Sequence, residues 1–274
     1  METIPVEERH PSGGGGAGLA ASTLVVARRA LLRFVRTPQL VVLGTMQMVV
    51  FLLIFRYVFG GAIGVGSGLS YVDFLVPGFV ATGVLFIGTG TAIAVAEDRE
   101  QGSFDRLRSL PIPRASVLLG RSLADTGVLV WTLAVATVVG FAAGFRLHGS
   151  VVEALMAFGI CVVFGFAFGW LFIALGMMAG NAQAAQGIGF LVFPLVFVSS
   201  AYVPVATLPG WLRAFAEHQP VTYMVDAVRA LTLGPLAETA LGHPASFFVS
   251  RALLWAAVIA VAAGAFAVDR YRRV

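Results

Sequence analysis

The sequence of 274 residues contains no lysine, and all 18 of its basic residues are arginine. A P-loop nucleotide hydrolase needs the lysine of its G-x-x-x-x-G-K-[ST] motif to reach the phosphates of the nucleotide. The glycine run GGGGAG at residues 13–18 lacks that lysine and is typical of a flexible linker. Hydrolysis of ATP by a P-loop within this chain is therefore excluded.

Cysteine and histidine are also scarce. The single cysteine, Cys161, excludes an intrachain disulfide, and its place in an apolar run predicts a small buried side chain. The four histidines are scattered (His10, His148, His218 and His243), and no H-E-x-x-H motif occurs. Neither a metal site nor an intramembrane metalloprotease is supported by this spacing, and we expect the chain to bind no metal and no cofactor.

Charge is scarce as well, since 12% of the residues are charged and 58% are hydrophobic, with a mean hydropathy of +0.90. Soluble domains carry about 25% charged residues, so this chain has too few polar groups to cover a water-exposed surface. We therefore predict an all-α integral membrane protein. The high pI of about 9.8 is explained by arginines at the cytoplasmic ends of spans, and we expect no nucleic-acid partner.

The N-terminal region divides into two parts. Residues 1–19 are polar and glycine-rich, without a signal-peptide pattern, and predict a disordered cytoplasmic tail. Residues 20–38 predict an amphipathic interfacial helix that ends near Pro38. Its apolar positions recur at helical spacing (Leu24, Ala27, Leu31 and Val35), and its arginines share another face (Arg29, Arg33 and Arg36). These arginines would meet anionic lipid phosphates.

Residues 39–274 predict one transmembrane domain with six apolar stretches. About 20 helical residues cross the roughly 30 Å of bilayer hydrocarbon. The predicted spans are about 39–59, 74–96, 115–144, 151–179, 187–203 and 247–268. The fifth is short for a full crossing, and residues 204–245 after it mix prolines with amphipathic pieces. We expect short outer helices there, re-entrant or interfacial, packed against protein.

Arginine placement predicts the orientation of these spans. If the N-terminus is inside, 13 arginines lie on the cytoplasmic side and 5 lie outside: Arg56, Arg146, Arg213, Arg229 and Arg251. The positive-inside rule then puts both termini of a multi-pass membrane protein in the cytoplasm.

A charged island, EDREQGSFDRLRSLPIPR at residues 97–114, separates the second and third predicted spans. It holds four acidic and four basic residues around an apolar stripe formed by Phe104, Leu107 and Leu110. Gly102 should loosen the turn before this stripe, and Pro111 should end the helix after it. A solvated loop is the alternative, but the stripe favours a short cytoplasmic helix that docks on a partner.

Three separated stretches carry a resemblance to a known family. They are RRALLRFVRTPQLVVLGTMQMVVFLLIFRYVFGGAI from residue 28, EDREQGSFDRLRSLPIPRASVLLGRSLAD from residue 97, and SSAYVPVATLPGWLRAFAEHQPVTYMVDAVRALTLG from residue 199. Together they resemble the ABC type-2 exporter permeases, in particular the membrane subunits of daunorubicin/doxorubicin-type drug exporters. The resemblance covers residue 24 to the C-terminus. Gln219 departs from the family pattern, which more often has asparagine there.

This resemblance implies a division of labour between polypeptides. The chain would be a non-catalytic permease that pairs with a second copy or a paralogue, while a separate cytoplasmic ABC ATPase binds ATP and Mg²⁺. The complex would export a hydrophobic or amphiphilic drug, antibiotic or lipid, as in multidrug efflux and antibiotic resistance. The island would be the coupling helix on the ATPase, with its interface at Glu97, Asp98, Arg99, Glu100, Phe104, Asp105, Arg106, Leu107, Arg108, Leu110, Pro111 and Arg114.

Two other functions stay open from the sequence. A membrane scaffold or sensor could use the same cytoplasmic helix to recruit a partner. An ion-coupled secondary transporter would need an ionisable group deep in the bilayer. The charged residues in the spans all fall near span ends (Arg56, Asp73, Asp125, Glu153 and Arg251), which weighs against that transporter.

Overall fold

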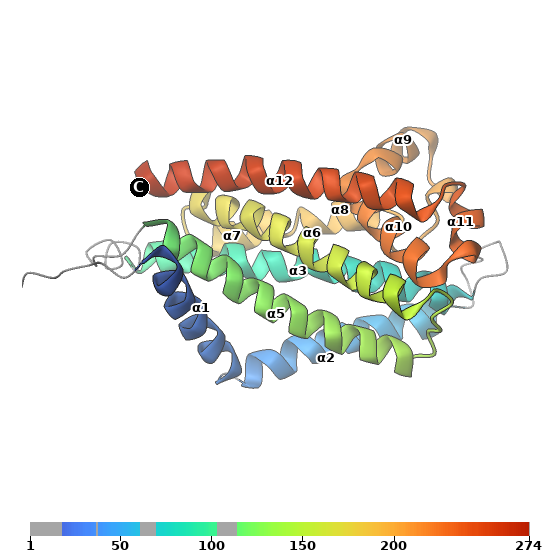
Figure 1. Ribbon diagram of the computed structural model, residues 1–274, viewed down its shortest axis with the longest axis horizontal. Coiled ribbons are helices and arrows are strands. Elements are labelled where there is room, and N and C mark those ends of the chain that lie inside the picture. Colours follow the sequence, from blue (N-terminus) through green and yellow to red (C-terminus); the bar gives the residue numbers. More distant parts are fainter. Residues whose placement is uncertain (1–17, 37, 61–69, 103–113, 274) are drawn as a thin grey trace, which may run out of the picture.

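The computed structural model describes residues 18–36, 38–60, 70–102 and 114–273, without the side chains at 33, 38–45, 59, 114–115 and 272–273. In this part of the chain the secondary structure is helical and contains no strand. Four long helices run roughly along one axis (Figure 1): α3 (Tyr71–Glu100), α5 (Arg114–Ala142), α6 (Val151–Met178) and α12 (Ala245–Arg273). Each contains a segment long and apolar enough to cross a membrane, so the chain is a multi-pass membrane protein.

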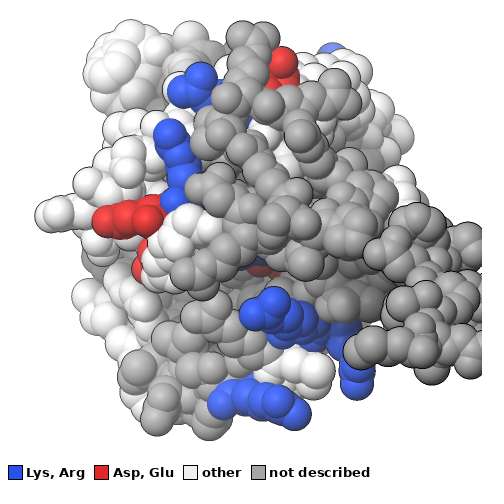
Figure 2. Space-filling model, turned by 90° about the vertical axis from the view of Figure 1, so that its left-hand side faces the viewer, with Lys and Arg blue, Asp and Glu red and all other residues white. Residues whose placement is uncertain are grey.

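The connections place the junction of α3 with α5 and the C-terminal end of α12 at one end of this bundle. Helix α3 ends there, α5 begins there, and α6 and α12 also end there, on the left in Figure 1. Figure 2 views this end and shows basic and acidic side chains together on its described surface. The described chain thus begins and ends at the same end of the bundle. Which side faces the cytoplasm stays a prediction.

Five of the six predicted spans correspond to helices. Four lie on α3, α5, α6 and α12, and their predicted ends differ from the helix bounds by at most five residues. The first, 39–59, corresponds to α2 (Pro38–Ile54) followed by one π-helical segment, η1 (Phe55–Phe59). Apolar runs of this length identify helices well because each helix satisfies its own backbone hydrogen bonds in lipid.

The prediction of a fifth span at 187–203 is wrong as a single helix. The structure has two short helices there, α7 (Ala182–Gly189) and α8 (Val192–Phe197), and residues 198–204 are not helical. Gly187 and Gly189 weaken the first helix. Pro194 lies in the first turn of α8, where its missing N–H costs nothing, but its ring prevents an unbroken helix from running through.

Residues 204–245 form the short helices that their prolines predict. The segment contains a 3₁₀ turn, η2 (Val205–Thr207), followed by α9 (Gly210–His218), α10 (Pro220–Leu233) and α11 (Pro235–Leu241). Pro220 and Pro235 each begin a helix, where proline has the required φ and no N–H is needed. Helix α10 packs against α3, α6 and α12 and is buried along most of its length, so the segment does pack against protein.

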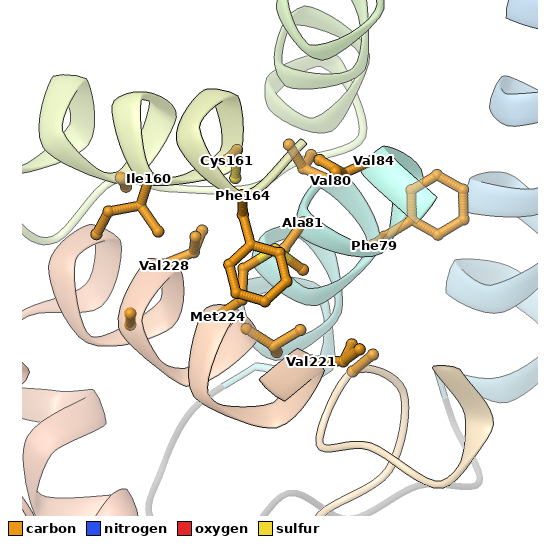
Figure 3. Packing of buried hydrophobic residues seen from close by; sticks show 14 of the residues in the cluster. Phe79, Val80, Ala81, Val84, Ile160, Cys161, Phe164, Val221, Met224 and Val228 are labelled. Atoms are coloured by element: carbon orange, nitrogen blue, oxygen red, sulfur yellow. The ribbon is translucent and has the colours of Figure 1, made fainter. Parts of the chain in front are cut away.

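The main hydrophobic core lies where α3, α6 and α10 meet. Figure 3 shows its side chains, including Phe79 and Val84 from α3, Phe164 from α6, and Met224 from α10. Cys161 also lies in this core and is only 1% exposed, so the prediction of a small buried side chain is confirmed. The core fixes α10 inside the bundle and thereby positions the polar groups of that helix.

The predicted amphipathic helix is α1 (Leu19–Val35), and it packs along α5. A Cβ atom on Gly120 of α5 would lie 2.8 Å from the Thr23 carbonyl oxygen and 2.7 Å from the Val26 Cβ atom, so only glycine permits this approach. Of the predicted apolar positions, Ala27 is buried against the protein, whereas Leu24 and Val35 are 63% and 69% exposed and would face lipid in an interfacial helix.

Candidate functional site

The charged island begins at the last turn of α3. Residues Glu97–Glu100 complete that helix, and Gly102 then adopts a φ of 65°, a left-handed conformation that suits glycine and confirms the predicted turn. The rest of the predicted interface lies outside the described residues: Phe104, Asp105, Arg106, Leu107, Arg108, Leu110 and Pro111. Arg114 opens α5, with its side chain not described. The described base of the island is thus the junction of α3 with α5.

Arg121 of α5 joins the two helices that flank the island. Its Nη1 lies 3.2 Å from Oδ2 of Asp98 at the end of α3. Its Nε donates to both carboxylate oxygens of Asp125, one turn further along α5, at 3.2 and 3.1 Å. All three side chains are between 22% and 35% exposed, so water only partly screens these contacts. One guanidinium therefore connects the start of α5 to the end of α3.

Arg99 connects the island to a third helix. Its Nη1 donates to the carbonyl oxygens of Met177 and Ala179, at 2.8 and 3.2 Å, where α6 ends. The last carbonyls of a helix have no partner within the helix, and they carry the negative end of its dipole. The guanidinium of Arg99 gives these carbonyl oxygens a hydrogen-bond donor and places a positive charge at the negative end of the helix dipole. The base of the island is consequently attached to α3, α5 and α6.

The predicted interface residues therefore divide into two groups. Asp98 and Arg99 make contacts within the chain, whereas Glu97 and Glu100 are exposed at the same helix end. Arg29 and Arg36 of α1 are exposed, as the membrane-interface prediction requires, and the Arg33 side chain is not described. The exposed carboxylates of Glu97 and Glu100 make no ion pair or side-chain hydrogen bond within the described part of the chain and remain available to a partner.

A second cluster of polar groups lies at the opposite end of the bundle, around a buried ion pair on α10. Arg229 is 1% exposed, and its Nη1 lies 2.8 Å from Oδ1 of Asp226. Its Nη2 donates to the carbonyl oxygens of Ser200 and Phe74, at 2.9 and 3.2 Å, and the guanidinium carbon lies 3.8 Å from the centre of the Phe74 ring. Ser200 also donates its hydroxyl to Asp226 at 2.7 Å.

These contacts explain how two charges stay inside the fold. Burial raises the pKa of the Asp226 carboxyl, while the charge of Arg229 and the hydrogen bonds from Ser200 and Arg229 oppose that rise. Burial also lowers the pKa of Arg229 to about 10. Arg229 therefore stays protonated at neutral pH and balances Asp226.

A cavity of 480 Å³ opens beside this ion pair. Its wall comes from the start of α3, the 200–206 loop, α9, α10, α11 and the start of α12. His218 and His243 line it, but the described residues contain no group of three or more His, Cys, Asp or Glu side chains that could hold a metal.

Sequence reasoning missed this cavity and its ion pair. It counted Arg229 only as one of the outer arginines and did not single out Asp226. The available signal was an acid and an arginine three residues apart in the apolar stretch VDAVRALTL, which places both on one side of a helix.

Comparison with known proteins agrees with the resemblance that the sequence motifs carry. The family model described as ABC-2 type transporter matches residues 21–233. The daunorubicin resistance ABC transporter permease protein DrrB1 of Streptomyces coeruleorubidus is 32% identical over 219 residues, which cover 80% of this chain and 77% of that protein. The probable doxorubicin resistance ABC transporter permease protein DrrC of Mycobacterium tuberculosis is 29% identical over 92% of this chain and 89% of its own length. Nodulation protein J of Rhizobium meliloti is 29% identical over 72% of this chain and 81% of its own.

Proposed function

The chain belongs to the ABC-2 type transporter family, and from this premise we propose that it is the membrane permease subunit of an ATP-driven drug exporter. The observation that carries this proposal is the family match over residues 21–233, which includes both helices that flank the charged island. Matched proteins named for daunorubicin and doxorubicin resistance support a hydrophobic or amphiphilic cargo. An antibiotic or a lipid has the same amphiphilic character.

The energy would come from a separate ABC ATPase subunit. This chain has no lysine with which to build a P-loop, so ATP and Mg²⁺ would bind to the partner. The permease would work as a dimer with a second copy or a paralogue, in the bacterial plasma membrane, with the island and both termini in the cytoplasm.

Residues 97–114 would be the element on which the ATPase acts. The contacts at its base support this role. Arg121 joins α5 to Asp98 of α3, and Arg99 joins α3 to the end of α6. A force on the island would therefore move three long helices together, which an unattached loop could not do. Glu97 and Glu100 would contact the partner, together with the apolar stripe of Phe104, Leu107 and Leu110.

Co-expression with an ABC ATPase from the same cell tests this function. The purified complex, placed in lipid nanodiscs, should hydrolyse ATP faster when daunorubicin is added. The double variant Phe104→Ser/Leu107→Ser should weaken ATPase binding by at least about tenfold, because it removes the apolar anchor. Arg121→Gln should keep the ATPase bound but lose most of the stimulation by drug, because α3 is no longer tied to α5.

Arg270→Gln is the matched control, since Arg270 is an exposed arginine at the same end of the molecule. Daunorubicin should stimulate ATP hydrolysis by the complex of this variant as much as it does for the unchanged chain. A chain that binds no ABC ATPase from its own cell would contradict the exporter function and favour a membrane scaffold. Full stimulation in Arg121→Gln would contradict the coupling role of the island's base.

A further inference from the structure

Helices α7 and α8 share one exposed face, although the helical structure is interrupted between them. Both pack against α3 and bury four residues at helical spacing: Ala185, Gly189, Val192 and Val196. Exposed residues recur between these with the same spacing, and the pattern continues across the break. We call these exposed residues the α7–α8 stripe: Gln183, Gln186, Gly187, Phe190, Phe193 and Phe197.

The break between the two helices lies level with the middle of α3. The ring of Phe193, at the start of α8, lies 5.1 Å from the ring of Phe86, measured between centres. Phe86 is near the centre of α3, which has 30 residues, more than the roughly 20 that cross the bilayer hydrocarbon. The break is therefore at hydrocarbon depth. Its two residues, Phe190 and Leu191, are 62% and 69% exposed.

Lipid is a poor cover for this break. Non-helical backbone at hydrocarbon depth is tolerated only where protein or a water-filled cavity surrounds it, because lipid tails form no hydrogen bonds. In the described part of the chain nothing covers Phe190 and Leu191. A second polypeptide on this face would provide the missing cover.

The composition of the stripe also differs from that of a lipid-facing helix. The exposed face of α12 is largely aliphatic, with Leu254, Val258 and Val261 between 50% and 73% exposed. The α7–α8 stripe has two amides, one glycine and three phenylalanines instead. Small residues and amides are enriched where membrane helices contact each other, and aromatic residues are enriched in protein interfaces. The stripe therefore has the composition of a protein contact.

The amides of the stripe indicate which polypeptide would fit. Gln183 and Gln186 are exposed and make no side-chain hydrogen bond within the described part of the chain. An amide has both donors and an acceptor, so the same amide in a second copy is a matching partner. The stripe carries no charged side chain, so two copies can face each other without repulsion. In a twofold dimer one patch meets itself, which this surface permits.

Gly187 would allow the second copy to approach closely. A Cβ atom at this position would meet nothing within 4 Å in this chain, so packing within the chain does not require glycine here. Glycine nevertheless costs about 1 kcal/mol relative to alanine inside a helix. At contacts between membrane helices, small residues let the two backbones come close together. The position of Gly187 in the stripe is thus explained by a contact outside the chain.

We propose that the α7–α8 stripe is the surface through which two copies of this chain pair about a twofold axis. The inference rests on the dimer of the proposed function and deepens it by naming the partner and the surface. The amides of Gln186 would bond across the contact, and the rings of Phe190 and Phe193 would pack on those of the second copy. Pairing itself requires no ATPase.

Self-association of the full chain in phosphatidylcholine liposomes tests the proposal. Förster transfer between donor-labelled and acceptor-labelled copies, followed as lipid dilutes the protein, gives the dissociation constant. Gly187→Leu should weaken pairing at least about tenfold, because the new side chain overpacks the contact. Gln186→Leu should weaken it about fivefold, because both copies lose an interhelical hydrogen bond. The thermal stability of the Gly187→Leu chain in detergent should be unchanged or higher, since leucine favours the helix.

Gly159→Leu is the matched control, since Gly159 of α6 also has open space around its Cβ position and lies outside the stripe. It should pair as the unchanged chain does. A surface that faces lipid would make Gly187→Leu and Gln186→Leu neutral for pairing, and either a neutral Gly187→Leu or a chain that stays monomeric would overturn the proposal. Pairing with a paralogue but not with a second copy would overturn it as well.

Crosslinking between copies provides a second measurement. Phe190→Cys, treated in liposomes with a flexible bis-maleimide, should yield the covalent dimer as its main product. Val261→Cys on α12, where the native residue is 73% exposed, should yield little dimer, and buried Cys161 should yield none. Equal crosslinking at the two introduced cysteines would contradict the assigned surface.

These measurements separate the interface from the exporter function. Pairing is measured without an ATPase, so a chain that pairs through the stripe but binds no ATPase would retain the interface and lose the proposed function. Drug-stimulated ATP hydrolysis that is unaffected in a complex whose chains do not pair through the stripe would have the opposite meaning.

Discussion

At the scale of single residues, the Asp226–Arg229 pair is the most demanding feature of the fold. Removing two charges from water costs several kcal/mol for each ion, and a buried pair recovers this only when further hydrogen bonds are satisfied. Ser200 and the Phe74 carbonyl supply those bonds. The pair therefore depends on residues from α3 and from the loop after α8 as much as on α10.

Single substitutions in this pair should be costly. Arg229→Met should lower the free energy of unfolding by about 3–5 kcal/mol, because Asp226 is left buried without its counter-ion. The double variant Asp226→Asn/Arg229→Met should lose clearly less than the sum of the two single variants, because neither charge remains. Denaturant unfolding of the purified chain in detergent, followed by tryptophan fluorescence, measures the three values. Additive losses would contradict direct coupling of the two side chains.

At the scale of elements, the contact of α1 with α5 depends on one glycine. Gly120→Val should push α1 away from α5, because the new Cβ atom would meet the Thr23 carbonyl oxygen and Val26. Overpacking of this kind costs about 1–3 kcal/mol. Backbone amides of Leu19–Val35 should then exchange hydrogen faster, which mass spectrometry measures on the peptides of this helix.

Gly159→Ala on α6 is the control for this prediction, since a Cβ atom there meets nothing within 4 Å. It should leave the exchange of α1 unchanged. Unaltered exchange in Gly120→Val would mean that α1 does not depend on this close approach.

The elements also differ in how far sequence alone predicts them. The four long helices follow from apolar runs, since each can form independently of its neighbours. The interrupted segment at 182–197 is harder to predict, because its apolar composition conceals the break at residues 190–191, between Gly189 and Pro194. The face that α1 buries depends on small residues of α5 nearly 100 positions away, so its own periodicity cannot identify that face.

For the site residues too, the sequence predicts local features but not those that depend on tertiary packing. The turn at Gly102 is local, and the sequence predicts it. The ties of Arg121 to Asp98 and of Arg99 to the end of α6 join groups 23 and 78 or more positions apart, and they arise only from tertiary packing. The ion pair of α10 is visible in sequence as two charges on one helix. Its partners, Phe74 and Ser200, are not.

At the scale of the whole molecule, the orientation of the bundle can be tested with a single reactive probe. Cys161 is buried, so the unchanged chain should not react with a membrane-impermeant maleimide and serves as its own control. His148→Cys, exposed in the α5–α6 connection, should label in intact cells. Ser103→Cys, in the island, should label only after the membrane is permeabilised, because the arginine bias places it inside. Labelling of Ser103→Cys but not His148→Cys in intact cells would show the opposite orientation and contradict the prediction.

The buried pair on α10 also has a consequence for biogenesis. An aspartate and an arginine each cost about 2.5–3.5 kcal/mol at the centre of an inserting helix, so α10 alone is a poor candidate for partitioning into lipid. Its guanidinium is accommodated by the carbonyl oxygens of Phe74 and Ser200, which are synthesised earlier. Helix α10 must therefore take its place after α3 and the loop beyond α8 are already present, which orders the late steps of co-translational assembly.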